Sequence, residues 1–228
     1  MQSLRVIATG DGSSSVLNTR LNETYHSTHG AIQESQFIFI ERGLDFWVTR
    51  NPENNNINIL EIGFGTGLNA LLSNQYATSH KKKIIYETLE AYPIDESVWS
   101  ELNYPALTND KQNFQRLHEA PWGEQVEINN CFSIRKRFET LQAALFSTDH
   151  FDVVFFDAFA PSTQPELWEI EMLTKVVSAL KPAGVFVTYC AKGQLKRDLK
   201  SLGLSVEKVP GPPGKREFIR GVKVPKDL

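Results

Sequence analysis

The sequence predicts an α/β fold, in which helices cover both faces of a mostly parallel β-sheet. First, an apolar run at 57–62 passes through a glycine-rich turn directly into a helical pattern. Second, similar apolar runs with helical patterns between them, as in a doubly wound sheet, recur at 84–89, 151–156 and 185–190. Third, two short strands at 204–209 and 216–222 follow the last of these runs and predict a closing antiparallel hairpin.

The composition is that of an ordinary water-soluble protein. Of the 228 residues, 41% are hydrophobic and 22% are charged, with a formal net charge of −3. No stretch approaches the roughly 20 apolar residues of a membrane span, and the N-terminus lacks the apolar core of a signal peptide. We therefore expect a cytoplasmic protein without a membrane partner. The small negative charge disfavours nucleic-acid binding by charge alone, but it is compatible with a localised basic face.

Neither cysteines nor histidines form a metal-ligand pattern. Cys131 and Cys190 lie far apart in the sequence, so we expect two buried thiols in a reducing compartment. His26 and His29 are three residues apart but lack a clear third ligand nearby, which favours loop histidines with ordinary hydrogen bonds. We predict no metal site.

The N-terminal part, residues 1–50, is expected to be an extension packed on a core domain formed by 51–228. Residues 1–24 have the pattern of a short β-rich lead-in. A helical pattern follows over 32–44, and Gly43 is expected to end that helix.

The glycine-rich turn is the first candidate binding element. Gly63, Gly65 and Gly67 allow a sharp turn and leave no Cβ where a ligand must lie against the backbone. Their spacing differs from the G-x-G-x-x-G of dinucleotide folds. Glu61, at the end of the strand, would repel a phosphate and attract a cation. We therefore favour a pocket for a cationic nucleoside, S-adenosylmethionine, over a turn that binds nothing.

The next strand supplies further candidates. It ends in Glu90 and Ala91, and an acid at this position is placed to accept both hydroxyls of a ribose. The alternative is a solvated carboxylate. Residues 94–122 are helical and aromatic, and we expect them to form an insertion that caps the pocket. A third strand is expected over 126–134, followed by a helix through 141–145, with Glu139 as the candidate acid for the adenine amine.

Asp157 is the candidate catalytic residue, because it directly follows the apolar strand 151–156. A carboxylate at this strand end is placed to hold an amine nucleophile and to take up its proton. A purely structural carboxylate is the alternative. Pro161 stiffens the loop that follows. Phe159 and Trp168 have two open interpretations, stacking on a base or ordinary packing.

The C-terminal part is basic. A helix is expected over 169–180, a turn at 181–184, and another helix from Lys192 to Lys200. From Lys192 to Lys226 there are ten basic residues against the acids Asp198, Glu207 and Glu217. This segment is either a phosphate-binding face or a solvated basic surface.

These motifs, taken together, resemble the tRNA 5-(aminomethyl)uridine methyltransferases, that is, the stand-alone MnmD enzymes and the methyltransferase half of bifunctional MnmC. The resemblance covers roughly residues 20 to 222. It rests on Tyr25-His26-Ser27 with Gly30, Ile-Gly-Phe-Gly-Thr-Gly-Leu-Asn at 62–69, Glu-Ala-Tyr-Pro at 90–93, Phe-Asp-Ala-Phe-Ala-Pro at 156–161, Gln164 to Trp168, and Gly-Lys-Arg-Glu at 214–217.

The resemblance implies a class I S-adenosylmethionine-dependent methyltransferase, with a Rossmann-like doubly wound sheet, that N-methylates the 5-aminomethyl group of the wobble uridine in tRNA. It assigns the glycines, Glu90 and Ala91 to the cofactor and Asp157 to the substrate amine. The residues expected near the substrate nucleotide are Tyr25, Ser27, Phe159, Pro161, Lys215 and Arg216.

Two departures from the family pattern stand out. The chain ends at 228, leaving no room for an oxidase half, so separate enzymes are expected to supply the aminomethyl group. Residues 135–140 lack the expected Gly-Asp. The alternatives that the sequence leaves open are a methyltransferase acting on a small-molecule amine and a non-catalytic methyltransferase-like binding module.

Overall fold

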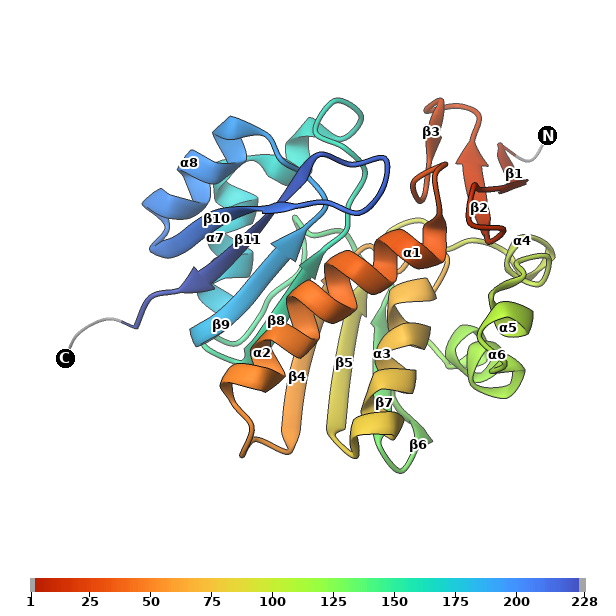
Figure 1. Ribbon diagram of the computed structural model, residues 1–228, viewed down its shortest axis with the longest axis horizontal. Coiled ribbons are helices and arrows are strands. Elements are labelled where there is room, and N and C mark those ends of the chain that lie inside the picture. The colour runs from red at the N-terminus through yellow and green to blue at the C-terminus, as the bar shows by residue number, and fades with distance from the viewer. Residues whose placement is uncertain (1–2, 226–228) are drawn as a thin grey trace.

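An eight-stranded mixed sheet forms the centre of the protein, whose computed structural model describes residues 3–225 (Figure 1). The strand order is β10-β11-β9-β8-β4-β5-β7-β6. The strands are β4 (Asn56–Ile62), β5 (Lys83–Leu89), β6 (Gln125–Asn129), β7 (Phe132–Arg137), β8 (Phe151–Phe156), β9 (Leu180–Thr188), β10 (Leu204–Pro210) and β11 (Glu217–Lys223). The five central strands β9, β8, β4, β5 and β7 are parallel, whereas β10, β11 and β6 pair antiparallel with their neighbours. This confirms the predicted α/β fold and its closing hairpin.

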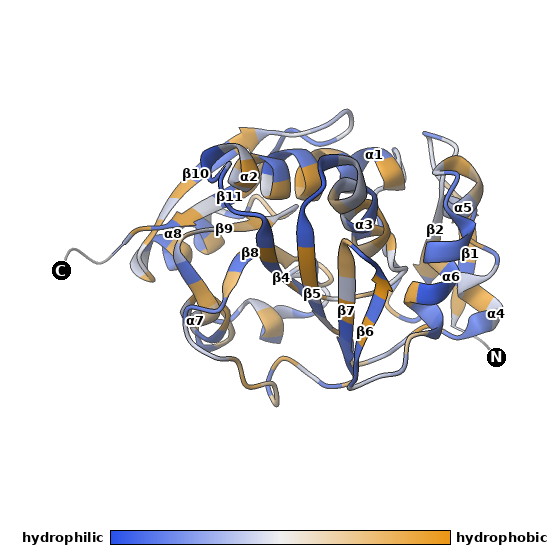
Figure 2. Ribbon diagram, turned by 90° about the horizontal axis from the view of Figure 1, so that it is seen from below, coloured by the Kyte–Doolittle hydropathy of each residue, from blue (hydrophilic) through white to orange (hydrophobic). Residues whose placement is uncertain are grey.

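Two separate hydrophobic cores lie on the two faces of the sheet, because successive strand residues point to opposite sides. Ile59 and Phe155 face the first core, whereas Leu60 and Phe156 face the second. Figure 2 shows α1, α2 and α3 on one side of the sheet and α7 on the other. The helices of the main sheet are α1 (Ala31–Ser35), η1 (Gln36–Asp45), α2 (Phe46–Arg50), α3 (Leu68–His80), η2 (Pro165–Trp168), α7 (Ile170–Ala179) and α8 (Gly193–Ser201).

The β-rich lead-in and the helical insertion lie side by side at one end of the molecule (Figures 1 and 2). The lead-in is a separate antiparallel sheet of β1 (Leu4–Ala8), β2 (Ser14–Asn18) and β3 (Glu23–Thr24). The insertion contains α4 (Glu96–Trp99), α5 (Tyr104–Leu107) and α6 (Lys111–Glu119). Asn103 joins the two, because its side chain accepts a hydrogen bond from the Ser14 amide and donates one to the Gly12 carbonyl. The division of the chain into 1–50 and 51–228 stays a prediction.

The expectation that Gly43 ends a helix is wrong. The chain continues from α1 through η1, which is π-helical, into α2, and Gly43 is buried within it. A Cβ on Gly43 would lie 2.8 Å from Val187 Cγ1 and 3.3 Å from Phe155 Cε1. The glycine therefore serves close packing of the helix on the sheet, and a helix-stop signal cannot be told from a packing signal in the sequence.

Residues 126–134 form a hairpin and not the single strand that we expected. β6 turns back into β7 after Asn129, whose side-chain oxygen accepts a hydrogen bond from the Cys131 amide. The expected helix through 141–145 is also absent, and turns take its place. Lys175 donates hydrogen bonds to the carbonyls of Leu141 and Gln142, so a side chain from α7 binds backbone groups that a helix would otherwise use.

Three smaller points concern the C-terminal half and the cysteines. The turn expected at 181–184 lies within β9, where the pairing with β8 shifts register between Phe151 and Val153. Both cysteines are free thiols, and Cys190 is buried whereas Cys131 is half-buried. Lys226 lies outside the described residues.

Within 3–225, every helix is too short or too polar to cross a bilayer.

We predict that Gly43→Ala lowers the free energy of unfolding by about 1 kcal/mol. Alanine favours a helix over glycine by about 1 kcal/mol, but overpacking against Val187 costs about 1–3 kcal/mol. Urea unfolding measures the change. Glu41→Ala, on the exposed side of the same helix, is the matched control and should change stability by less than about 0.5 kcal/mol. A Gly43→Ala protein more stable than the wild type would contradict the packing role of this glycine.

Candidate active site

A cavity of about 1260 Å³ opens at the carboxyl ends of β4, β5 and β8. This edge is where ligands bind in doubly wound sheets, and the volume is sufficient for a nucleoside and a second ligand. The register explains the convergence, because Ile62 lies opposite both Leu89 and Phe156. The next residue of each strand, Gly63, Glu90 and Asp157, therefore emerges at the same level of the sheet. All three line the cavity.

The glycine turn forms one wall of the cavity. Gly63 has a φ of +97°, and a Cβ there would lie 2.8 Å from the Asp157 carbonyl oxygen. Gly65 has a φ of +50°, and a Cβ there would lie 3.0 Å from the Tyr25 ring. Both positions require glycine, because the conformation is left-handed and the space is taken. Gly67 does not line the cavity, and a Cβ there would lie 2.9 Å from His118 Nε2.

Glu90 is fixed by the backbone around it. Its Oε2 accepts a hydrogen bond from the Gly65 amide at 3.0 Å, and its Oε1 accepts one from the Tyr92 amide at 2.8 Å. Burial raises the pKa of Glu90, and these amides partly oppose that rise. Ala91 lines the cavity beside it. The carboxylate thus has a defined position at the end of β5.

Glu139 also lines the cavity, but its carboxylate is ion-paired. The Arg137 guanidinium forms ion pairs with Glu139 and, at 2.6 Å, with Glu87. Glu139 is therefore held by the last residue of β7, two positions before it, and its Oε2 retains free lone pairs, because Arg137 binds only Oε1. Its expected role toward the adenine remains a prediction.

Glu61 does not line the cavity. Its side chain is only 1% exposed and lies on the sheet face that α3 covers, where its Oε2 accepts a hydrogen bond from Thr88 Oγ1 at 2.7 Å. Burial raises the pKa of Glu61 to about 8, and the nearby Asp157 adds to this. At neutral pH the group is mostly uncharged, so the sequence-based expectation that Glu61 attracts a cation does not fit its position.

Asp157 is half-buried at the end of β8. Its amide donates a hydrogen bond to the Ile62 carbonyl, and its Oδ2 accepts one from Asn69 Nδ2 at 2.8 Å. The pKa of Asp157 is raised to about 7. Burial is the largest cause, the charge of Glu34 adds to it, and Asn69 and Lys215 oppose the rise. Asp157 is therefore a carboxylate that both gains and loses a proton near neutral pH, as a general base requires.

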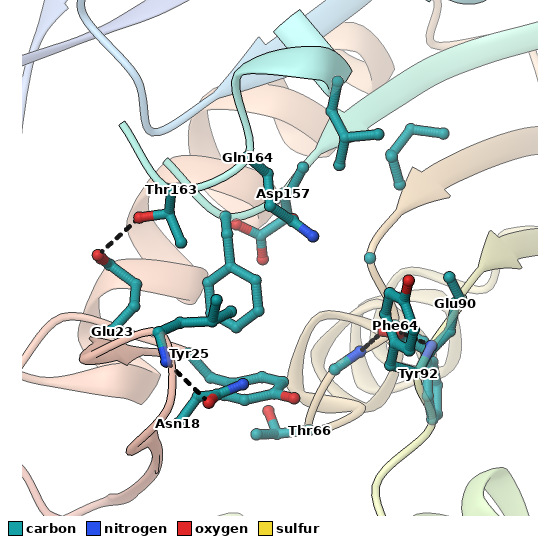
Figure 3. A pocket seen from close by; sticks show the side chains of 18 of the residues that line it. Asn18, Glu23, Tyr25, Phe64, Thr66, Glu90, Tyr92, Asp157, Thr163 and Gln164 are labelled. Atoms are coloured by element: carbon teal, nitrogen blue, oxygen red, sulfur yellow. Dashed lines mark hydrogen bonds between the residues drawn. The ribbon is translucent and has the colours of Figure 1, made fainter. Parts of the chain in front are cut away.

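The predicted substrate residues divide into two groups. Tyr25, Ser27, Phe159 and Lys215 line the cavity, and the rings of Tyr25 and Phe159 meet edge to face with centroids 5.0 Å apart. Pro161 and Arg216 lie outside it, and Arg216 is exposed. Figure 3 shows Tyr25, Asp157 and Glu90 around the same cavity. Trp168 is buried, with its Nε1 donating a hydrogen bond to the Phe159 carbonyl, which settles its role as packing.

His26 has a structural position. It is buried, and its Nε2 lies 2.6 Å from Thr66 Oγ1 in the glycine turn. Burial lowers its pKa to about 4, so the ring is neutral at physiological pH. His29 is exposed beside Gly214. His26 thus links the N-terminal residues to the turn.

Sequence reasoning missed Glu34, Asn69 and Tyr189 as site residues, although all three line the cavity. Asn69 stands in the helix directly after the glycine turn, and a polar residue on the buried face of that helix was the available signal. Tyr189 directly follows β9, so its place at a strand end was the available signal. Glu34 offered no local signal, because only tertiary contacts bring it to the cavity.

The carboxylates and the glycine backbone of the cavity suit a cationic nucleoside. Glycine backbone forms one wall, and two carboxylates, Glu90 and Asp157, stand at neighbouring strand ends on either side of it. Among the described residues, Arg20 and Lys215 are the basic side chains that line the cavity, which is not the cluster of lysines and arginines that a pyrophosphate would need. These observations fit S-adenosylmethionine, whose ribose hydroxyls and positive sulfonium both complement carboxylates.

Comparison with known proteins gives the same answer. Residues 97–224 match the model of a family described as S-adenosyl-L-methionine-dependent methyltransferase. The bifunctional protein MnmC, for tRNA 5-methylaminomethyl-2-thiouridine biosynthesis, is 28% identical in Nitrosospira multiformis, over 90% of this chain and 34% of the relative. The MnmC protein of Actinobacillus pleuropneumoniae serotype 5b is 26% identical over 91% of this chain and 33% of the relative. The chain spans about a third of the length of these relatives.

Among solved structures, MNMC2 from Aquifex aeolicus superimposes with a TM-score of 0.79 at 23% identity, over 99% of this chain and 72% of that chain. This confirms the fold, and the similarity to MnmC confirms the resemblance found in the sequence. The family implies S-adenosylmethionine as the cofactor, and the carboxylates and glycine wall described above are compatible with it. The chain therefore belongs to the family of S-adenosyl-L-methionine-dependent methyltransferases.

Proposed function

We propose that this protein transfers the methyl group of S-adenosylmethionine to the 5-aminomethyl group of the wobble (2-thio)uridine in tRNA, giving 5-methylaminomethyluridine. The observation that carries the proposal is Asp157, a carboxylate with a pKa near neutrality, beside the glycine turn in a cavity large enough for cofactor and nucleotide. The similarity to MnmC proteins supports the choice of substrate. A tRNA substrate would have the protein act in the cytoplasm.

Asp157 would bind the amine and receive its proton. A primary alkylamine is protonated at neutral pH, with a pKa near that of lysine at about 10.4, and its lone pair is free only after a proton leaves. A carboxylate stabilises the ammonium form, so its main contributions are to position the nitrogen and to accept the proton. When bound, S-adenosylmethionine supplies the electrophilic methyl group. Holding nucleophile and methyl group in line can contribute roughly 7–11 kcal/mol.

Five residues of the cavity wall would hold the cofactor. Gly63 and Gly65 present bare backbone to it, Glu90 and Ala91 lie where the ribose is expected, and Glu139 is the candidate for the adenine amine. Glu61 and Gly67, which lie behind the wall, would support the turn without touching the ligand.

The substrate nucleotide would lie on the opposite side, against Tyr25, Ser27 and Phe159. Lys215 is already paired with Glu34 at 2.7 Å inside the cavity, so it is not free to bind a phosphate. The exposed Arg216 is the better candidate for the phosphate backbone, and the aromatic rings of Tyr25 and Phe159 could stack with the base.

A methyltransferase for a small-molecule amine is the second candidate, favoured by the net negative charge of the chain. Salt separates the two, because phosphate contacts release counterions and make tRNA binding steeply salt-dependent. A non-catalytic binding module is disfavoured, since Gly63, Glu90 and Asp157 all stand at one cavity.

Glu90→Ala should weaken binding of S-adenosylmethionine by about 10–100-fold. The mutation removes a charged acceptor, and hydrogen bonds to charged groups contribute about 1.5–3 kcal/mol. Calorimetry with the cofactor or its demethylated product measures the loss. Glu96→Ala, an exposed glutamate of α4 outside the cavity, is the matched control. Equal affinity in the wild type and Glu90→Ala would remove Glu90 from the cofactor site.

Asp157→Ala should leave cofactor binding largely intact but lower turnover by about 10²–10⁴-fold, as expected for loss of a proton acceptor. In the wild type, kcat/KM should fall as pH drops below about 7, because protonation of Asp157 removes the acceptor. Steady-state rates between pH 5.5 and 8.5 measure both effects. Unchanged turnover in Asp157→Ala would exclude Asp157 from the mechanism.

Nucleoside mass spectrometry tests the substrate. In tRNA from cells lacking this chain, aminomethyluridine should accumulate, and the purified protein should convert it to methylaminomethyluridine with one equivalent of methyl donor. Free aminomethyluridine serves as the comparison substrate. Conversion of the free nucleoside as efficiently as of tRNA, without salt dependence, would favour the small-molecule alternative.

A further inference from the structure

Glu34 is a second carboxylate in the cavity that lines it together with Asp157. It belongs to α1 and is only 8% exposed. Carboxylates are rarely this buried unless they are paired or hydrogen-bonded, and Glu34 is both. Its position beside a proton-accepting residue calls for an explanation beyond packing.

Both oxygens of Glu34 are held by elements from distant parts of the chain. Oε1 pairs with Lys215 Nζ at 2.7 Å, and Oε2 accepts a hydrogen bond from the Ser27 amide at 2.9 Å. Lys215 lies in the loop between β10 and β11, and its Nζ lies 4.4 Å from the centre of the Tyr189 ring. The partners therefore hold the pair in one defined geometry.

Most titratable groups that face Asp157 are uncharged at neutral pH. They come from the strands beneath and beside it, and they are Glu61 on β4, Tyr86 on β5 and Tyr189 after β9. Burial raises the pKa of each, which keeps Glu61 mostly protonated and both phenols neutral. The charged groups whose fields act most strongly on Asp157 are Glu34, from α1, and Lys215, from the C-terminal hairpin.

We propose, on the basis of the proposed function, that Glu34 is a positioning residue for the amine substrate and that Lys215 anchors it. The Glu34–Lys215 pair sets the charge around Asp157 and thereby the basicity of the Asp157 carboxylate. Glu34 and Lys215 together contribute no net charge, so the single charge of Asp157 matches the single charge of an ammonium. Without Glu34, the unpaired Lys215 would repel the ammonium and make Asp157 a weaker base.

The competing explanation is mechanical, since the pair also ties the C-terminal hairpin to the first helix. A mechanical tie predicts effects on stability, whereas the proposed role predicts a displaced titration of Asp157. The Asp157 titration in Glu34→Gln separates the two. Glutamine keeps the size of the side chain and one oxygen that can accept from the Ser27 amide, but it loses the charge that pairs with Lys215. A lost tie alone would lower stability without displacing the titration of Asp157.

The experiment is a ¹³C NMR titration of the free protein labelled at the aspartate carboxyl carbon, with the Asp157 signal assigned by its loss in Asp157→Asn. In Glu34→Gln the midpoint of Asp157 should fall by about one pH unit, because a like charge is removed and Lys215 is left unopposed. In Glu34→Gln/Lys215→Met the midpoint should lie between those of Glu34→Gln and the wild type. Asp149→Asn, which breaks a Lys223 pair outside the cavity, is the matched control and should not move it.

Two results would overturn the proposal. In the first, the Asp157 midpoint in Glu34→Gln stays at the wild-type value. In the second, the midpoint is the same in Glu34→Gln and in Glu34→Gln/Lys215→Met. The acid limb of kcat/KM should follow the same order as the NMR midpoints. The titration is recorded without substrate, so a wild-type protein that fails to methylate tRNA overturns the proposed function, while the NMR midpoints decide the role of the pair.

Discussion

The parallel pairing of β4 with β8 is the constraint on which the rest of the site depends. It puts Ile62 opposite Phe156, so that the glycine turn and Asp157 leave the sheet at one level. Gly63 then lies so close to the Asp157 carbonyl that no side chain fits between them. Because β5 pairs with the other side of β4, Glu90 joins the same edge, and three strand ends form one binding surface.

Burial of carboxylates is the second physical theme. Glu61, Glu90 and Asp157 all have raised pKa values, and in each case burial is the largest cause. Holding such groups away from water costs stability, and a cationic ligand offsets part of that cost for those that line the cavity. The same burial brings the pKa of Asp157 to about 7, where a carboxylate can serve as a proton acceptor.

The N-terminal residues complete the site from the opposite side. His26 bonds to Thr66 in the glycine turn, Tyr25 packs against Phe159, and Glu34 pairs with Lys215. These contacts connect the first helix and its preceding loop to the turn, to the loop after β8 and to the C-terminal hairpin. The cavity is therefore closed by segments from both ends of the chain around a site defined by the central strands.

The sequence by itself determined what depends on local pattern. The fold class and a site at the carboxyl ends of the strands could be predicted from apolar runs, from the spacing of Gly63 and Gly65, and from the acids Glu90 and Asp157 directly after their strands. This was possible because strand, turn and strand-end residue are neighbours in the chain. Only the tertiary structure decided that Gly43 packs on the sheet, that Glu61 faces α3, and that Glu34 meets Lys215. Each of these depends on which distant surface a side chain contacts, and no local periodicity records that choice.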